Sequence, residues 1–182
     1  MYTKILDFKV FNGSKDELMK ILLSEGNKYH IVSGNPEVLS TAYINPKLLK
    51  NFKEDNTIII PDGIGVKIAS HMVKAPVKEK IAGIEIMQEI TAYCFNNNKS
   101  IYLLGGKEEV IHSLKEKLLK DYPGINISGN HNGYYDKDEE KYIMDDIISK
   151  QPFALFVAMG CPRQEEFIID IMDKIHTGIM MG

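Results

Sequence analysis

Short apolar runs alternate with longer amphipathic stretches along almost the whole 182-residue chain, and this alternation constrains the fold more than any other feature. The runs are rich in β-branched or aromatic residues, and most are bounded by Gly, Pro or Asn, which is the pattern of buried β-strands. The predicted strands cover residues 29–33, 57–61, 100–104, 125–128, 153–159 and 177–181.

The stretches between the runs have the spacing of amphipathic helices. Residues 107–122, 138–150 and 164–175 carry apolar side chains three or four positions apart, which makes a stripe broad enough to cover a sheet. Asn35-Pro36 and Asn45-Pro46 each place Asn at a helix cap and Pro at the first helical position. Strand–helix alternation predicts an α/β, Rossmann-like fold with a mostly parallel sheet and helices on both faces.

Length and composition narrow the class of protein. At 182 residues the chain is expected to form one domain, over residues 1–182. A net charge of −3 makes a nucleic-acid partner a poor fit. Cys94 and Cys161 lie far apart, which favours two buried thiols in a reducing compartment. No signal peptide is recognisable and no apolar run approaches the ~18–20 residues of a membrane span, so a cytoplasmic location is expected.

The residues that follow the predicted strands form the candidate site, because ligands bind outside the carboxyl ends of the strands in open α/β sheets. Glycines there let the backbone approach a ligand, and helix N-termini direct N–H groups at phosphates. The candidates are Ser33, Asn35, Asp62, Gly63, Gly105, Gly106, Lys107, His131, Arg163 and Gln164.

Asp62 is the most specific of these candidates. It follows Ile-Ile-Ile-Pro and precedes Gly-Ile-Gly, which places a carboxylate at the mouth of the sheet. Partial burial there suits a general base, but a cap for a helix over residues 64–73 fits the spacing equally well. Asn35 has the same two interpretations, as a cap for its own helix or as a ligand contact. The spacing alone leaves both questions open.

Several named motifs are absent. The chain has no GxxxxGK[ST] loop, no GxGxxG after a strand and no GxSxG turn. The five histidines lack metal-ligand spacing, although His131 lies in a strand-end loop that suits ligand binding. Asp136 and Asp138 form a DxD pair, but a helical pattern follows at once and favours a helix cap. No metal site and no cofactor are therefore expected.

Six short blocks occur in a set order along nearly the whole chain. They read SGNPE at 33–37, PDGIG at 61–65, AGIEI at 82–86, LLGGK at 103–107, HNGYY at 131–135 and GCPRQE at 160–165. Together these blocks resemble the WecG/TagA/CpsF glycosyltransferase family. The PDGIG and GCPRQE blocks are the most specific part of the resemblance.

The resemblance implies an inverting glycosyltransferase, and the lack of a convincing DxD motif makes metal-independent catalysis the expectation. It would move N-acetylmannosamine, or its uronic acid, from a UDP-sugar to N-acetylglucosamine on undecaprenyl diphosphate, at the cytoplasmic membrane face. Asp62 matches the proposed catalytic base of the family, and Asn35 and Gln164 match its polar pocket residues. Ser33 stands where the family more often has Thr, and it keeps the hydroxyl.

Two expectations concern the rest of the molecule. The family continues into a C-terminal segment that is thought to touch the membrane and to supply arginines, and this chain stops before it. Arg163 is the single arginine here. A chain without that segment is expected to expose apolar surface and to form a homo-oligomer.

The donor sugar is predicted from composition and not from pocket chemistry. The uronic acid would favour a cationic partner, for which Lys80, Lys107 and Arg163 are the candidates. A chain rich in Lys, Ile and Asn suggests an AT-rich, Gram-positive genome, for which the resemblance implies teichoic acid linkage-unit synthesis and the neutral sugar. Two other classes stay open: a different nucleotide-dependent enzyme, such as a dehydrogenase or phosphotransferase, and a non-catalytic nucleotide-sugar sensor.

Overall fold

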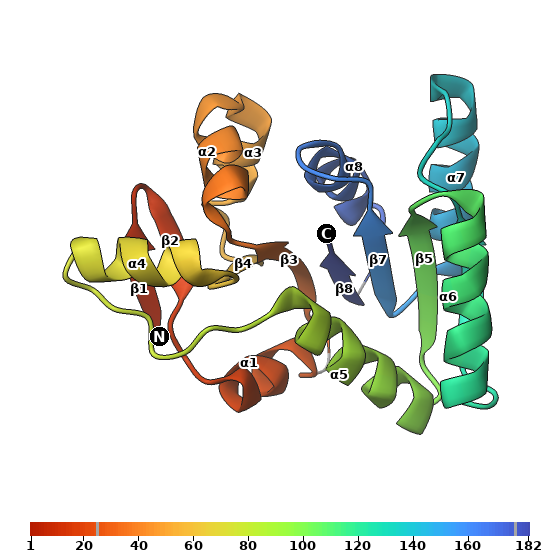
Figure 1. Ribbon diagram of the computed structural model, residues 1–182. Coiled ribbons are helices and arrows are strands. Elements are labelled where there is room, and N and C mark those ends of the chain that lie inside the picture. The colour runs from red at the N-terminus through yellow and green to blue at the C-terminus, as the bar shows by residue number, and fades with distance from the viewer. Residues whose placement is uncertain (25, 177) are drawn as a thin grey trace.

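An eight-stranded, mostly parallel sheet forms the centre of the molecule (Figure 1). The computed structural model describes residues 1–24, 26–176 and 178–182. The strand order is β1-β2-β4-β3-β8-β7-β5-β6, and only the β1–β2 pair is antiparallel. The strands are β1 (Tyr2–Ile5), β2 (Phe8–Phe11), β3 (Lys28–Ser33), β4 (Thr57–Ile60), β5 (Ser100–Gly105), β6 (Asn126–His131), β7 (Ala154–Ala158) and β8 (Gly178–Met181).

Helices pack on both faces of the sheet, as the alternation predicted. The helices are α1 (Lys15–Leu22), α2 (Pro36–Ile44), α3 (Pro46–Asn51), α4 (Ile64–Met72), α5 (Gly83–Asn96), α6 (Glu108–Asp121), α7 (Lys137–Lys150) and α8 (Arg163–Met172). One face carries α1, α5 and α6. The other face carries α2, α3 and α4 in one apolar cluster and α7 and α8 in a second.

The central strands are apolar without interruption because both of their faces are covered. In β4, Ile58 and Ile60 pack under α1 and α5, while Ile59 packs under α2 and α4. All three isoleucines are fully buried. This two-sided burial explains why the strands could be located in the sequence from apolar runs alone, without polar alternation.

The sequence did not predict four elements, β1, β2, α1 and α5. The β1–β2 hairpin and α1 fall in the N-terminal segment, to which no element had been assigned. The sequence predicts neither a strand nor a helix for the segment APVKEKIAGIEI, but only residues 75–82 are irregular, and α5 begins at Gly83. Its Ile86, Ile90 and Cys94 are buried against the sheet, so packing holds the first turn in a helix. The expected strand over 177–181 is present as β8, and Thr177 itself lies outside the described residues.

The predicted caps are confirmed. Asn35 and Asn45 cap α2 and α3 with their side-chain oxygens. The Asp136 carboxylate accepts hydrogen bonds from the N–H groups of Asp138 and Glu139, both at 3.0 Å, so the DxD pair opens α7 as a cap.

Two further expectations concern the cysteine thiols and membrane-spanning helices. Both cysteines are free thiols; Cys94 is buried and Cys161 half-buried. None of the helices built from the described residues has the length and apolar character needed to cross a bilayer.

Candidate functional site

A cavity of about 270 Å³ lies at the carboxyl ends of the central strands. The chain builds β1 to β4 on one side of the sheet and β5 to β8 on the other, and β3 meets β8 in the middle. A crevice at such a change of direction is where open α/β sheets bind ligands. Of the predicted site residues, the cavity is lined by Ser33, Asp62, Gly105 and Gly106.

Asp62 is held at the wall of this cavity by two backbone contacts. Its N–H donates to the carbonyl of Ile60 at 2.9 Å, and its Oδ2 accepts a hydrogen bond from the N–H of Gly83 at 3.2 Å. Gly63 is the cap of α4, and no side chain of the described residues is hydrogen-bonded to the first turn of that helix. The alternative in which Asp62 caps α4 is therefore wrong. Its carboxylate instead lies at the N-terminus of α5, an end that favours negative charge.

Gly83 belongs to the site although it was not among the predicted residues. A Cβ at this position would lie 2.6 Å from Ser33 Oγ and 3.4 Å from Asp62 Oδ2. Only glycine lets the start of α5 approach both polar groups this closely. The AGIEI block at 82–86 was the signal in the sequence for this position.

Gly105 and Gly106 form the opposite wall, where β5 passes into α6. Both have positive φ, +130° and +66°, and a Cβ on Gly105 would overlap the carbonyl of Ala158. The Gly106 N–H donates to Ala158 at 2.9 Å, and the Gly106 carbonyl accepts from the N–H of Gly133 at 2.8 Å. Lys107 caps α6 without a side-chain hydrogen bond. The glycine pair thus brings backbone, not side chains, to the cavity.

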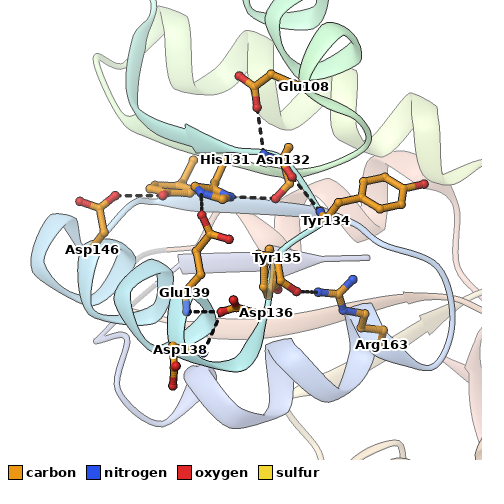
Figure 2. Close-up of polar contacts among 11 residues, drawn as sticks. Glu108, His131, Asn132, Tyr134, Tyr135, Asp136, Asp138, Glu139, Asp146 and Arg163 are labelled. Carbon is orange, nitrogen blue, oxygen red and sulfur yellow. Dashed lines mark hydrogen bonds and ion pairs between the residues drawn. The ribbon is translucent and has the colours of Figure 1, made fainter.

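Lys107 and His131 lie outside this cavity. Lys107 lines a separate, shallow hollow with Glu108, Glu109, Asn132 and Tyr134. Figure 2 shows the neighbouring contacts, in which Asn132 Nδ2 donates to Glu108 Oε2 at 2.9 Å. The His131 Nδ1 lies 2.9 Å from the Asn132 carbonyl, and its Nε2 lies 3.6 Å from a Glu139 carboxylate oxygen.

Arg163 is engaged with the loop that follows β6. Its guanidinium donates to the carbonyl of Gly133 at 2.6 Å. Figure 2 shows the guanidinium beside Tyr135, where it donates to the Tyr135 carbonyl at 3.5 Å and stacks over the ring, 4.4 Å from the centroid. Burial raises the pKa of Tyr135 to about 12, with the Arg163 charge opposing that rise. Arg163 therefore fastens the residue 131–135 loop to the start of α8, and it does not line the cavity.

Asn35 and Gln164 do not line the cavity. Asn35 Oδ1 accepts from the Val38 N–H at 3.0 Å as a cap. Gln164 Oε1 accepts from the Gly160 N–H, and Gln164 Nε2 donates to Glu165 Oε1, both at 2.9 Å. Gly182, which does line the cavity, packs against the Gln164 amide. Gly182 thus lies between Gln164 and the cavity.

Within residues 1–24, 26–176 and 178–182, no three His, Cys, Asp or Glu side chains are grouped closely enough to hold an ion.

Comparison with known proteins points to one family. The profile described as "Glycosyl transferase WecG/TagA/CpsF family" matches residues 3–182. Proteins of Staphylococcus aureus strains NCTC 8325 and MRSA252, both named N-acetylglucosaminyldiphosphoundecaprenol N-acetyl-beta-D-mannosaminyltransferase, are each 34% identical over 156 residues. That alignment covers 86% of this chain and 60% of each relative. The chain therefore spans about 60% of the length of the curated relatives it matches.

Proposed function

Because the chain belongs to the WecG/TagA/CpsF family of glycosyltransferases, we propose that it transfers N-acetylmannosamine from its UDP-sugar to N-acetylglucosamine on diphosphoundecaprenol. The observation that carries the proposal is the Asp62 carboxylate, fixed by Gly83 at the wall of a cavity between two glycine turns. The acceptor and the donor sugar come from the names of the Staphylococcus relatives.

Asp62 acts in this proposal as the general base. One oxygen of its carboxylate takes the proton from the attacking hydroxyl of the acceptor, which approaches the anomeric carbon opposite the departing UDP and inverts its configuration. Ser33 Oγ lies beside the same glycine and can hold a sugar hydroxyl next to the base. This arrangement requires the donor to lie across the glycine turn with its anomeric carbon toward Asp62.

The UDP leaving group needs stabilisation as its negative charge develops. Gly105 and Gly106 lead directly into α6, whose first N–H groups and dipole favour an anion. Glu108 and Glu109 in the same turn oppose this field, so the backbone N–H groups are the part of the helix that serves a diphosphate. We propose that the chain uses these groups and no metal ion, and that transfer therefore continues in the presence of EDTA.

The cationic residues support the neutral donor over the uronic acid. A donor carboxylate would call for Lys80, Lys107 or Arg163, and none of these three lines the cavity among the described residues. The Arg163 guanidinium already donates to the Gly133 carbonyl and stacks on the Tyr135 ring. Teichoic acid linkage-unit synthesis at the cytoplasmic face of the membrane is the process that this acceptor and donor imply.

The proposal is tested first by binding. UDP should raise the melting temperature of this chain, while NAD and ATP at the same concentration should not. A protein of the relatives' full length should then be given both UDP-sugars with a lipid-diphosphate N-acetylglucosamine acceptor, with and without EDTA. Preferential binding of NAD or ATP would contradict the proposed enzyme class, and preference for the uronic acid would contradict the donor.

A further inference from the structure

The outer side of α4 exposes apolar side chains that a helix of this kind normally buries. Ile64, Ile68 and Met72 are 70%, 55% and 79% exposed. They are four residues apart, so they lie along one side of the helix. Figure 1 shows α4 at the left edge of the molecule, beside the β1–β2 hairpin and far from α6 and α7.

The inner side of α4 is well packed, so the exposed stripe belongs to a firmly placed helix. Val66 and Ser70 are fully buried. Ser70 Oγ donates to the Lys67 carbonyl at 2.7 Å and accepts from the Val77 N–H at 3.1 Å. A Cβ on Gly65 would lie 2.5 Å from Pro36, which shows how closely α4 approaches α2.

The exposed stripe is flanked by cations. Lys67, His71 and Lys74 border it, and neither lysine has an ion pair within the part of the chain that the structure describes. No Asp or Glu occurs from Gly63 to Lys78, although the protein as a whole has a net charge of −3. We call this surface the α4 face, defined by Ile64, Lys67, Ile68, His71, Met72 and Lys74.

An apolar groove of about 260 Å³ extends the α4 face toward the hairpin. Leu6, Leu39, Met72 and Val73 are among its lining residues. Asp7 is the acid of the hairpin turn, and its carboxylate oxygens lie 3.7 Å from Lys4 Nζ and 3.8 Å from Lys53 Nζ. The charge of Asp7 is therefore compensated, and the α4 face itself presents apolar and cationic groups.

We propose that the α4 face contacts an anionic lipid bilayer. Exposed Ile and Met side chains beside lysines are the composition of helices that lie in a membrane interface, where the apolar groups insert and the cations meet lipid phosphates. A second copy of this chain is a weaker match. Two α4 faces packed together would bring two cationic flanks together, and neither helix has a carboxylate to pair with them.

The position of α4 connects the bilayer to the site. Ile64 follows Asp62 by two residues, so a bilayer on the α4 face lies next to the edge of the sheet that carries the base. The purpose of this contact rests on the proposed function, because a lipid-linked acceptor reaches the site in the plane of the membrane. The contact itself depends only on the surface of α4.

The test is sedimentation of the 182-residue chain with vesicles of phosphatidylcholine alone or mixed with phosphatidylglycerol. The chain should bind the mixed vesicles and dissociate at high salt. Lys67→Glu with Lys74→Glu should weaken binding at least about 20-fold, since each lysine near an anionic surface contributes roughly fivefold. Ile68→Ser with Met72→Ser should weaken it at least about tenfold. Circular dichroism and melting temperature establish that each variant is folded.

The matched control places the same changes on another exposed helix surface. Leu119→Ser with Lys120→Glu on α6 should leave vesicle binding within about twofold of the parent. Equal binding to both vesicle types, or equal loss in the control, would overturn the proposal. So would α4-face variants that abolish self-association in sedimentation velocity but leave vesicle binding unchanged. The vesicles contain no acceptor and no UDP-sugar, so failure of the proposed transfer reaction would leave this result intact.

Discussion

At the residue scale, the site depends on three residues that lie far apart in the sequence and close together in the structure. Ser33 ends β3, Asp62 follows β4 and Gly83 begins α5. The first two could be predicted because each follows an apolar run. Gly83 could not, because its importance comes from the lack of a Cβ where a helix meets Ser33 and Asp62, and only coordinates show that approach.

Gly83→Ala adds only one methyl group, but we expect it to reduce both stability and turnover. The new Cβ would lie 2.6 Å from Ser33 Oγ, so either the serine or the start of α5 must move. We expect a loss of about 1–3 kcal/mol in unfolding free energy, as for other overpacked positions, together with reduced turnover. Urea unfolding measures the first and a kinetic assay of the full-length protein measures the second. Gly124→Ala, where a Cβ meets open space, is the control for backbone strain alone.

His30 gives a second prediction at this scale. It is fully buried, and its Nδ1 lies 2.8 Å from Asn51 Oδ1, while its Nε2 has no partner among the described residues. Burial lowers the pKa of His30 to about 4. Between about pH 6.5 and pH 4, the unfolded chain binds a proton that the folded chain does not, so stability falls as the pH is lowered through this range.

The measurement is urea unfolding at pH 7 and pH 5. His30 should account for about 2 kcal/mol of the loss between these pH values, and His30→Gln should remove that part of the slope. His112→Gln, on the exposed surface of α6, should leave the slope unchanged. If His30→Gln and the parent lose stability equally between the two pH values, the folded protein does not keep His30 neutral.

At the scale of elements, apolar runs located β3 to β8 and amphipathic spacing located α6, α7 and α8, because buried parallel strands and amphipathic helices have distinct apolar periods. The β1–β2 hairpin has a weaker signal. Its strands are only four residues long. Its turn includes Leu6 at φ +53°, and a Gly or Asn at that position would have indicated the turn in the sequence. The start of α1 did carry a signal, since Ser14 and Glu17 form a capping box.

Asp136 tests one element directly. Its carboxylate caps α7, and Asn caps a helix about as well as Asp does, whereas Ala does not. Asp136→Ala should lower the unfolding free energy by about 1 kcal/mol, and Asp136→Asn should leave it nearly unchanged. Transfer by the full-length protein should survive Asp136→Asn. A large loss of activity with Asn, reversed by added divalent cations, would mean that the DxD pair acts as a metal site.

At the scale of the whole molecule, the site is shared between the two halves of the sheet. Ser33 and Asp62 come from one half, and Gly105, Gly106 and Ala158 come from the other. The sequence predicted that strand ends carry the site, but it could not supply the strand order that puts β8 beside β3. For the same reason Lys107, His131 and Arg163 could not be separated from the cavity residues before the β6–α7 loop was placed.

The central claim is that Asp62 is the general base of a UDP-dependent transfer, and one variant tests it most directly. Asp62→Asn in a protein of the relatives' full length keeps the shape of the side chain and removes its ability to take a proton. The account predicts that UDP binding, measured by calorimetry, stays within about twofold of the parent, while kcat falls by about 10²–10⁴. Near-normal turnover by Asp62→Asn would contradict the account, because the carboxylate would then serve only to hold the start of α5.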